Sequence, residues 1–168
     1  YNAACGNNEE SIRIENFDPG VIGNYGESHK VLDETNSVEV ACLKIDTLKL
    51  QMCDVIKIDV EGEELNVMKG AIKTIKKFRP VIFFEALEEN DWESCYKYLE
   101  KLDYKMYWVV CRVNPISHKT FKESEVHPFK DVASFNIIAI PNEREQPDDL
   151  APVTLGEWYH TLVNRLRS

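Results

Sequence analysis

Long apolar runs, an excess of basic residues and a leader peptide are all missing from this sequence. No apolar run approaches the roughly 20 residues that a membrane-spanning helix requires, so no membrane span is expected. The 20 Lys and Arg residues are outnumbered by 29 Asp and Glu residues, and the formal charge is −9. Binding along a phosphate backbone requires a basic face, so nucleic acid is not expected as a partner. The opening residues are polar and show no signal peptide.

Several metal-site and catalytic motifs are absent as well. The five cysteines form no CxxC pair, and their odd number does not suit a disulfide framework. A zinc site is therefore not expected, and reduced thiols favour a cytoplasmic location. The Gly-x-Ser-x-Gly motif of serine hydrolases is missing, and no two of the four histidines have the i, i+4 spacing of a metal site.

The sequence does contain the pattern of a single α/β domain. Its 168 residues are 43% hydrophobic, which is enough to bury one core. The β-branched run 55–60 predicts a strand, apolar residues at helical spacing predict a helix over 61–77, and 81–84 predicts a second strand. Strand, helix and strand in this order form a βαβ unit with parallel strands and a right-handed crossover. The near-continuous apolar character of both strands suits a sheet that is covered on both faces.

The alternation of strands and helices continues on either side of this unit. Alternating patterns at 11–14 and 38–43 predict two strands that can pair antiparallel. Downstream, the pattern predicts a helix over 92–102 and strands over 105–110 and 134–140.

The end of the chain has a different composition from the rest. We expect a folded domain over 1–141 and a proline-rich, charged surface linker over 142–153. Residues 154–168 are expected to form a C-terminal helix, because Thr154 and Glu157 have the spacing of a capping box.

Two acidic residues follow the strands of the βαβ unit. Asp59 lies near the end of the first strand, and Glu85 ends the second. Ligands of open α/β sheets bind beyond the carboxyl ends of the strands, and neighbouring strands lie about 4.8 Å apart. The two carboxylates would then share one cleft, where they can hold a divalent metal or take a proton from a hydroxyl group. The structural alternative is that Glu85 caps the following segment and Asp59 orders the turn.

The tract Glu-Gly-Glu-Glu at 61–64 separates the first strand from the helix. Negative side chains stabilise the N-terminus of a helix, which is a structural explanation for its glutamates. Gly62 allows a special turn or a close backbone approach. Lys57 would be costly in a buried strand unless it were paired, and Asp59 lies on the same face, so an ion pair is predicted.

A glycine-rich loop over 18–29 precedes these elements. It lacks the preceding buried strand and the following helix of a dinucleotide fingerprint, so a phosphate-binding role is not favoured. His29 ends this loop and is a candidate general base, because a glycine-rich loop can reach into a cleft.

The centre of the chain carries three motifs in a specific order: DVIKIDVEGEE at 54–64, VMKGA at 67–71 and RPVIFFE at 79–85. Shorter matching segments flank them: YNAA at 1–4, LKIDTL at 43–48 and the strand 134–141. Together they resemble the FkbM family of S-adenosylmethionine-dependent methyltransferases over roughly residues 1–141.

The resemblance implies an α/β fold with the Rossmann-like sheet of class I methyltransferases, mostly parallel with an antiparallel last strand. It implies an enzyme that transfers a methyl group from S-adenosylmethionine to a hydroxyl oxygen of a sugar, glycan or small secondary metabolite. Residues 1–141 would be the C-terminal portion of such a domain. The donor-binding strands of the family would lie upstream of Tyr1, so we expect an upstream domain or a second chain to complete the fold.

The resemblance also implies roles for individual residues. Asp59 would orient or deprotonate the acceptor, or would ligate a metal, with Mg²⁺ as the candidate ion. Glu85 would be the acid at the end of the next strand, and Asn2 and Ala3 would lie where the adenine is recognised. The residues implied to contact the donor are Asn2, Ala3, Asp59, Glu61 and Gly62.

Two other functions stay open at this point. A noncatalytic, methyltransferase-like interaction module would expose an unpaired hydrophobic sheet edge for a partner. A metal-dependent phosphatase would use Asp59 and Glu85 as an acid pair and would release phosphate without a methyl donor.

Overall fold

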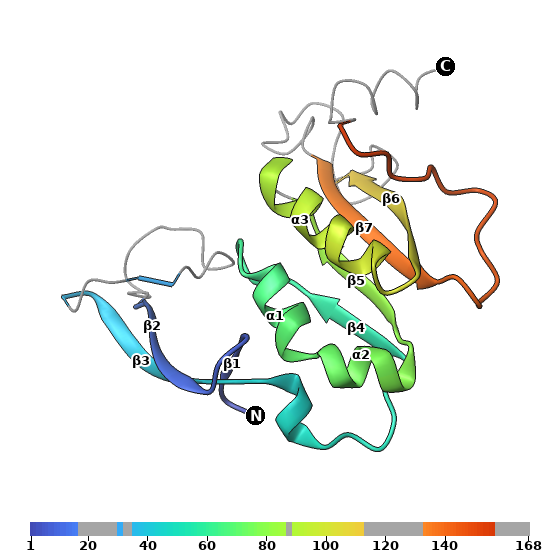
Figure 1. Cartoon of the computed structure of the whole chain (residues 1–168). Helices are drawn as coiled ribbons and strands as arrows, with labels where there is room; N and C mark the ends of the chain where they lie inside the picture. The colour runs from blue at the N-terminus through green and yellow to red at the C-terminus, as the bar shows by residue number, and fades with distance from the viewer. Residues whose placement is uncertain (17–29, 32–34, 87–88, 113–132, 157–168) are drawn as a thin grey trace, which may run out of the picture.

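The computed structural model describes residues 1–16, 30–31, 35–86, 89–112 and 133–156. The glycine-rich loop with His29 and nearly all of the predicted C-terminal helix lie outside these residues. The described part is a mixed α/β structure with two sheets and three α-helices (Figure 1). All five cysteines are free thiols, as their spacing predicts.

The first sheet is small and has the strand order β1-β3-β2. Strand β3 pairs in parallel with β1 and antiparallel with β2, so the predicted antiparallel pair is confirmed. The bounds are β1 Ala4–Cys5, β2 Glu10–Glu15 and β3 Ser37–Leu43, followed by a short 3-10 helix, η1, at Ile45–Leu48.

The second sheet has the strand order β4-β5-β7-β6. Strands β4 and β5 are parallel neighbours, which confirms the predicted βαβ unit. The last strand, β7, runs antiparallel to both of its neighbours, as expected. The bounds are β4 Val55–Ile58, β5 Val81–Glu85, β6 Tyr104–Arg112 and β7 Ala133–Pro141.

The α/β class is confirmed, whereas the expected Rossmann-like, mostly parallel sheet is not confirmed among the described residues. Only the β1–β3 and β4–β5 pairs are parallel, and the strands form two mixed sheets. The physical reason is that β6 and β7 pair directly along nine residues as antiparallel neighbours, with β7 inserted between β5 and β6.

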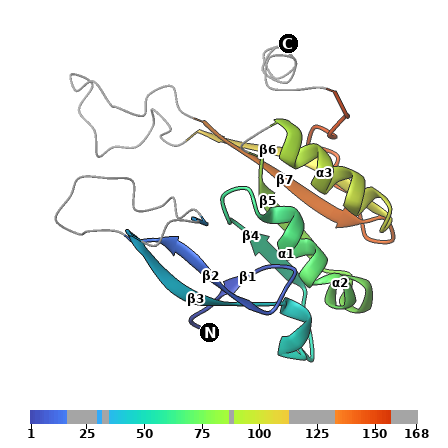
Figure 2. The ribbon, with the colours of Figure 1, turned by 60° about the vertical axis from the view of Figure 1, so that its left-hand side comes forward.

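Three helices lie over one face of the second sheet (Figures 1 and 2). They are α1 Glu64–Gly70, α2 Ile72–Phe78 and α3 Glu89–Glu100. Alternate strand residues such as Ile58, Phe84 and Ile137 point into this layer and are almost fully buried. From α3, Trp92 packs edge-on against Trp108 of β6, with ring centroids 5.4 Å apart. Burial of large apolar side chains is the main favourable contribution to such a core.

The expectation that both faces of β4 are buried is wrong. Ile56 and Ile58 are buried, whereas Val55 is 63% exposed and Lys57 is also exposed. Among the described elements the helices cover only one face, so β4 alternates between core and surface. The charge of Lys57 is therefore in contact with water and requires no burial.

The predicted helix over 61–77 is divided at Ala71. Helix α1 begins only at Glu64, because Glu61 and Gly62 have positive φ angles of 43° and 90°. Helix α2 has its own cap, since the Asp46 carboxylate accepts hydrogen bonds from the backbone N–H groups of Lys73 (2.9 Å) and Thr74 (2.8 Å). The cap comes from η1, far away in the sequence, so helical periodicity could not predict it.

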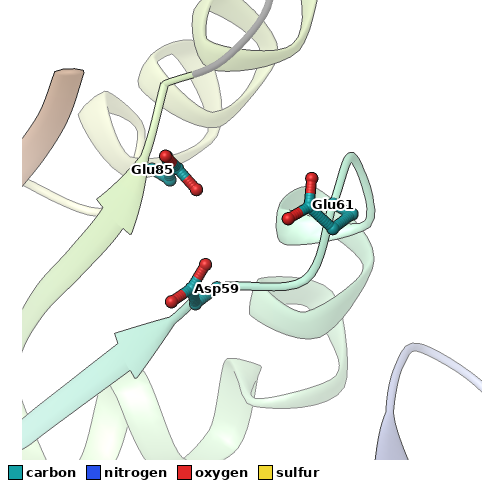
Figure 3. Close-up of side chains that lie close together, drawn as sticks. All are labelled: Asp59, Glu61 and Glu85. Carbon is teal, nitrogen blue, oxygen red and sulfur yellow. The ribbon is translucent and has the colours of Figure 1, made fainter. Parts of the chain in front are cut away.

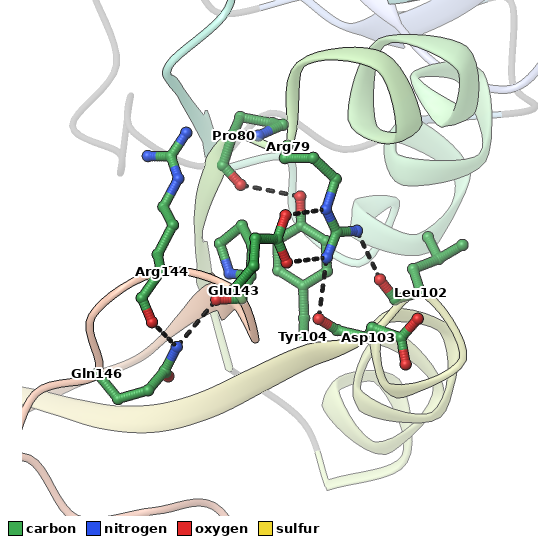
Figure 4. A network of polar contacts seen from close by, with 9 residues as sticks. Arg79, Pro80, Leu102, Asp103, Tyr104, Glu143, Arg144 and Gln146 are labelled. Atoms are coloured by element: carbon green, nitrogen blue, oxygen red, sulfur yellow. Dashed lines mark hydrogen bonds and ion pairs between the residues drawn. The ribbon is translucent and has the colours of Figure 1, made fainter.

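The predicted end of the helix at residue 77 is confirmed to within one residue, since α2 ends at Phe78. Arg79 adopts the left-handed conformation at the C-terminal end of α2 and begins a polar network at the amino end of β5 (Figure 4). Its guanidinium group donates hydrogen bonds to both carboxylate oxygens of Glu143, at 2.7 and 2.8 Å. The Tyr104 hydroxyl donates to the Pro80 carbonyl at 2.9 Å.

The end of the segment expected to be a linker pairs with the sheet. The Trp108 N–H donates to the Ala151 carbonyl at 2.8 Å, and the Val153 N–H donates to the Met106 carbonyl at 2.9 Å. Val153 is 6% exposed. The chain therefore covers part of the outer edge of β6, whereas β4 is the opposite edge strand of the described sheet.

Candidate functional site

Three carboxylates meet at the carboxyl end of the β4–β5 pair (Figure 3). Asp59 follows β4, Glu85 is the last residue of β5, and Glu61 lies in the loop before α1. The Ile58–Phe84 register places the two strand ends side by side. One oxygen of each carboxylate lies within 4.8 Å of the others. The predicted proximity of Asp59 and Glu85 is confirmed, while their catalytic roles stay predictions.

Like charges so close together affect the protonation of Glu85. Burial raises the pKa of the Glu85 carboxyl, and the negative charges of Asp59 and Glu61 raise this pKa further. A hydrogen bond with Asp59 acts in the same direction, and a hydrogen bond from Ser134 opposes it. Glu85 therefore keeps a proton more readily than an ordinary glutamate.

The predicted ion pair between Lys57 and Asp59 is present. The side chains of both residues are more than half exposed, at 62% for Lys57 and 51% for Asp59. Such an exposed pair contributes little to stability, because water and salt screen it. It does place one positive charge beside the three carboxylates.

The glutamate side chains of residues 61–64 have different partners. The Gly62 N–H donates to the buried Glu64 carboxylate at 3.2 Å, which braces the turn from within. Asn66 of α1 donates to Glu63 at 2.8 Å, and both residues line the cavity described below. Gly62, with its φ of 90°, supplies the special turn that the sequence predicts. Only Glu61 reaches the acidic cluster.

A cavity of about 450 Å³ lies between the first sheet and the β4–α1 loop. One wall carries Asp59, Glu61 and Glu63. The facing wall belongs to β1, β2 and β3 and carries Asn2 and Ala3. The full lining is Tyr1, Asn2, Ala3, Ala4, Cys5, Gly6, Asn7, Asn8, Glu10, Ile12, Ile14, Lys30, Val40, Cys42, Asp59, Val60, Glu61, Glu63 and Asn66. Four of the five predicted donor-contacting residues therefore line one cavity, whereas Gly62 is not among its lining residues and Glu85 lies beside it, next to Asp59.

Two glycines hold the facing wall in place. The Gly6 N–H donates to the Leu43 carbonyl at 3.0 Å, which ties the end of β1 to β3. A Cβ atom on Gly70 would lie only 1.9 Å from the Gly6 carbonyl oxygen. The end of α1 and the chain after β1 can touch this closely only because residue 70 has no side chain. This contact sets Asn2 and Ala3 opposite the acidic wall.

The charges that line the cavity are mostly negative. Its carboxylates are those of Glu10, Asp59, Glu61 and Glu63, and its one lysine, Lys30, lies 4.0 Å from Glu10. A cavity lined by one sign of charge attracts ligands of the opposite sign. The site therefore favours a ligand with a positive centre and offers little to a carboxylate.

Sequence reasoning overlooked Ser134 and Asn136, which flank Glu85 from β7. Asn136 donates to the Ser134 hydroxyl at 2.9 Å, and Ser134 donates to Glu85 at 3.5 Å. The signal was two polar residues at i, i+2 in an otherwise apolar strand. His29, in contrast, lies outside the described residues, so its proposed base role is not examined by the structure.

Among the described residues, Asp59, Glu61 and Glu85 form the only cluster of three possible metal-ligating side chains. Carboxylate oxygens are the ligands that Mg²⁺ takes in proteins, but exposed acidic groups also gather without an ion. No ligand role is assigned to them.

Residues 1–106 match the model of a known family, the methyltransferase FkbM domain. The chain belongs to the FkbM methyltransferase family. The match covers β1 to the start of β6 and contains both Asp59 and Glu85. It ends before β7, so the wider resemblance over 1–141 is supported only for its first part. No curated protein and no solved structure gives a match.

No helix in the described part of the chain has the length and apolar character needed to cross a membrane.

Proposed function

We propose that this protein is an S-adenosylmethionine-dependent O-methyltransferase that acts on a hydroxyl group of a sugar, glycan or small secondary metabolite. Membership of the FkbM family supports methyl transfer. The observation that carries the proposal is the position of Asp59, which lines the cavity and is also a neighbour of Glu85. A carboxylate at this position can receive the proton of an acceptor hydroxyl.

The cavity fits most of the donor. The sulfonium and ammonium groups of S-adenosylmethionine are positive, and they suit the wall of Asp59, Glu61 and Glu63. On the facing wall, the Asn2 amide offers both a donor and an acceptor to the edge of a base. The apolar side chains of Ile12 and Val40 give the ring a surface to pack against.

The carboxylate of the donor is the part that these residues do not fit. Lys30 is the only basic residue in the cavity lining, and it already lies near Glu10. We therefore propose that an upstream domain or a second chain supplies the groups that bind the donor carboxylate. The 168-residue chain alone should then bind the donor weakly.

The residues of the site divide the chemical work. Bound S-adenosylmethionine supplies an electrophilic methyl group, so the protein has to position the acceptor and remove its proton. Asp59 would accept the hydroxyl proton while the methyl carbon passes from the donor sulfur to the acceptor oxygen, which would leave the donor as the neutral thioether S-adenosylhomocysteine. Glu85, whose pKa is raised by burial and by the negative charges of Asp59 and Glu61, lies beside Asp59 at the edge of the cavity.

The cofactor and location are also part of this proposal. Mg²⁺ is a second candidate ligand, supported only by the acidic cluster, and no step depends on it. A chelator such as EDTA should leave methyl transfer unchanged if Asp59 acts as a base without an ion. The five free cysteines favour the cytoplasm.

Replacement of Asp59 tests the proposed base directly. The chain is incubated with tritium-labelled S-adenosylmethionine, at a concentration high enough to offset weak donor binding, and with a panel of sugars, oligosaccharides and hydroxylated metabolites. Label in the acceptor is then counted. Asp59→Asn should lower turnover by about 100-fold, which is typical for loss of a general base. The matched control is Asp54→Asn, an exposed aspartate before the opposite end of β4, which should transfer methyl groups like the wild type.

Other outcomes would favour the alternatives. Equal turnover of Asp59→Asn and the wild type would remove Asp59 from the mechanism. Metal-dependent release of phosphate without a methyl donor would favour the acid-pair phosphatase. The noncatalytic module is favoured only by the unpaired outer edge of β4 in the described sheet. It predicts no methyl transfer from the chain, even with its completing partner present.

A further inference from the structure

Glu85 lies opposite two polar residues of β7. Its Cα partner in the antiparallel register is Asn136. Ser134, two residues before Asn136, lies on the same face of the strand, because side chains alternate along a strand. Below them on this face, Phe83 pairs with Ile138. The polar pair therefore begins where the apolar part of β5 and β7 ends.

The hydrogen bonds between these residues have a definite direction. The Asn136 amide donates to the Ser134 oxygen at 2.9 Å. This occupies one lone pair of the hydroxyl, and the hydroxyl proton is then available to Glu85, whose Oε1 lies 3.5 Å away. The result is a relay of donors that runs from Asn136 through Ser134 to the Glu85 carboxylate.

Glu85 needs such a restraint because of what it faces. Its carboxylate lies within 4.8 Å of those of Asp59 and Glu61, and like charges at this distance repel one another. The backbone after Glu85 is fixed, since the Ala86 N–H donates to the Phe135 carbonyl at 2.8 Å. Rotation of the Glu85 side chain away from Asp59 would therefore lower the repulsion without any movement of the backbone.

We propose that Ser134 and Asn136 are positioning residues that hold the Glu85 side chain beside Asp59. This inference rests on the proposed function, in which Asp59 receives the acceptor proton and Glu85 lies beside it. The two residues need not touch the donor or the acceptor, because they act through Glu85. Their contribution is to the coupling between the two acids.

The coupling can be measured without any acceptor. The full chain is labelled with ¹³C at glutamate carboxyl carbons, and the Glu85 signal is identified by its loss in Glu85→Gln. Its titration midpoint is then followed by NMR, with and without Asp59→Asn. In the wild type, Asp59→Asn should lower the midpoint, because a neighbouring negative charge is removed. The size of this lowering reports the distance between the two carboxylates, because the effect of one charge on the other falls with distance.

The same difference is measured in variants of the relay. In Ser134→Ala, Asp59→Asn should lower the midpoint by less than half as much as in the wild type, because Glu85 is free to turn away. Ser134→Thr keeps the hydroxyl and should restore the full lowering. Asn136→Ser removes the amide that donates to Ser134, and in this variant Asp59→Asn should also lower the midpoint by less than in the wild type. Tyr107→Phe is the control, since this hydroxyl donates to Gln146 and not to Glu85.

An undiminished lowering in both Ser134→Ala and Asn136→Ser would overturn the positioning role. A lowering that falls equally in Tyr107→Phe would also overturn it, because the effect would then be general to the sheet. The inference and the proposed function fail separately. If Ser134→Ala and Asn136→Ser reduce the lowering but the protein transfers no methyl group, the positioning role stands. Only the proposed function is then contradicted.

Discussion

The two ends of the β4–β5 strand pair differ in the charged groups that they bring together. At the amino end of β5, the Arg79 guanidinium group meets the Glu143 carboxylate through two hydrogen bonds. At the carboxyl end, Asp59, Glu61 and Glu85 bring three negative charges within 4.8 Å of one another. One end pairs opposite charges, and the other gathers three carboxylates with a single positive charge, that of Lys57, beside them.

At the amino end of β5, called the arginine end below, the Arg79 guanidinium group has several further partners. Arg79 also donates to the carbonyl oxygens of Leu102 (2.6 Å) and Asp103 (3.0 Å), and its guanidinium lies 4.6 Å from the centre of the Tyr104 ring. The Arg79 hydrogen bond lowers the pKa of Glu143 to about 2, and burial raises the pKa of Tyr104 to about 12. These shifts describe groups that stabilise the fold.

The acidic end has the opposite character. The pKa of Glu85 is raised by burial and by its negative neighbours, so its charged form is disfavoured in the folded state. A structure keeps such an arrangement when the strain serves a site, and perturbed carboxylates are typical of catalytic positions. The two ends therefore differ in what the fold gains: the arginine end favours the charged form of its acid, and the acidic end disfavours the charged form of Glu85.

The largest effect is expected from Gly70→Ala, which tests whether the acidic end needs its facing wall. The new Cβ would lie 1.9 Å from the Gly6 carbonyl oxygen, so the end of β1 must move away from α1. The free energy of unfolding should fall by about 3 kcal/mol, as measured by urea denaturation. Because alanine favours a helix more than glycine does, any loss must come from the clash.

Gly156→Ala is the control for a generic cost of replacing glycine. It has a φ of 81° but no atom within 4 Å of the added Cβ. Its cost should be about 1 kcal/mol, from backbone strain alone. Equal losses in Gly70→Ala and Gly156→Ala would mean that the Gly6–Gly70 contact does not hold the wall.

Arg79→Ala comes next and tests the stabilising end. It removes hydrogen bonds to Glu143 and to two carbonyl oxygens, and the free energy of unfolding should fall by about 2 kcal/mol. Arg79→Lys keeps the charge but loses the planar fork, so it should recover only part of the loss. Methyl transfer at low temperature should remain near the wild-type rate in both. A stability loss near zero would contradict the division between the two ends.

The smallest effect is expected from Glu85→Gln, and its sign is opposite. The folded-state pKa of Glu85 is raised above its ordinary value of 4.5, so its contribution to stability is present below about pH 4.5 and is lost as pH rises through the folded pKa. Glu85→Gln should therefore be slightly more stable than the wild type at pH 7. The two proteins should be equal near pH 4.

Thermal unfolding across this pH range measures the difference, with Glu145→Gln as a control at an exposed glutamate outside the cluster. A Glu85→Gln difference that does not change with pH would show that Glu85 is not disfavoured in its charged form.

The comparison also shows what local sequence patterns can predict. The strands β4 and β5, their parallel pairing and the meeting of Asp59 with Glu85 followed from two apolar runs, each ending near an acidic residue, and from the parallel pairing of a βαβ unit. The Lys57–Asp59 pair followed from two-residue alternation. These features depend on short stretches of chain, where period and spacing determine the geometry.

Features set by contacts distant in the sequence were not predicted. The division of the helix depends on Asp46, which caps α2 from 27 residues away. The place of β7 between β5 and β6, and the pairing of 151–153 with β6, depend on which edges meet in space. Ser134 and Asn136 reach Glu85 only because β7 lies there. The periodicity of the local sequence does not indicate which strand edges pair in the folded chain.

The most direct test of the central claim is an NMR titration of the ¹⁵N-labelled chain with S-adenosylmethionine, because it detects even weak binding. The account predicts chemical shift changes at amides of the cavity, such as those of Ala3, Val60 and Glu61, and none around Arg79. Asp59→Asn should reduce these changes. Shifts confined to other parts of the chain, or none at millimolar donor, would contradict the claim that this acidic cavity holds the methyl donor.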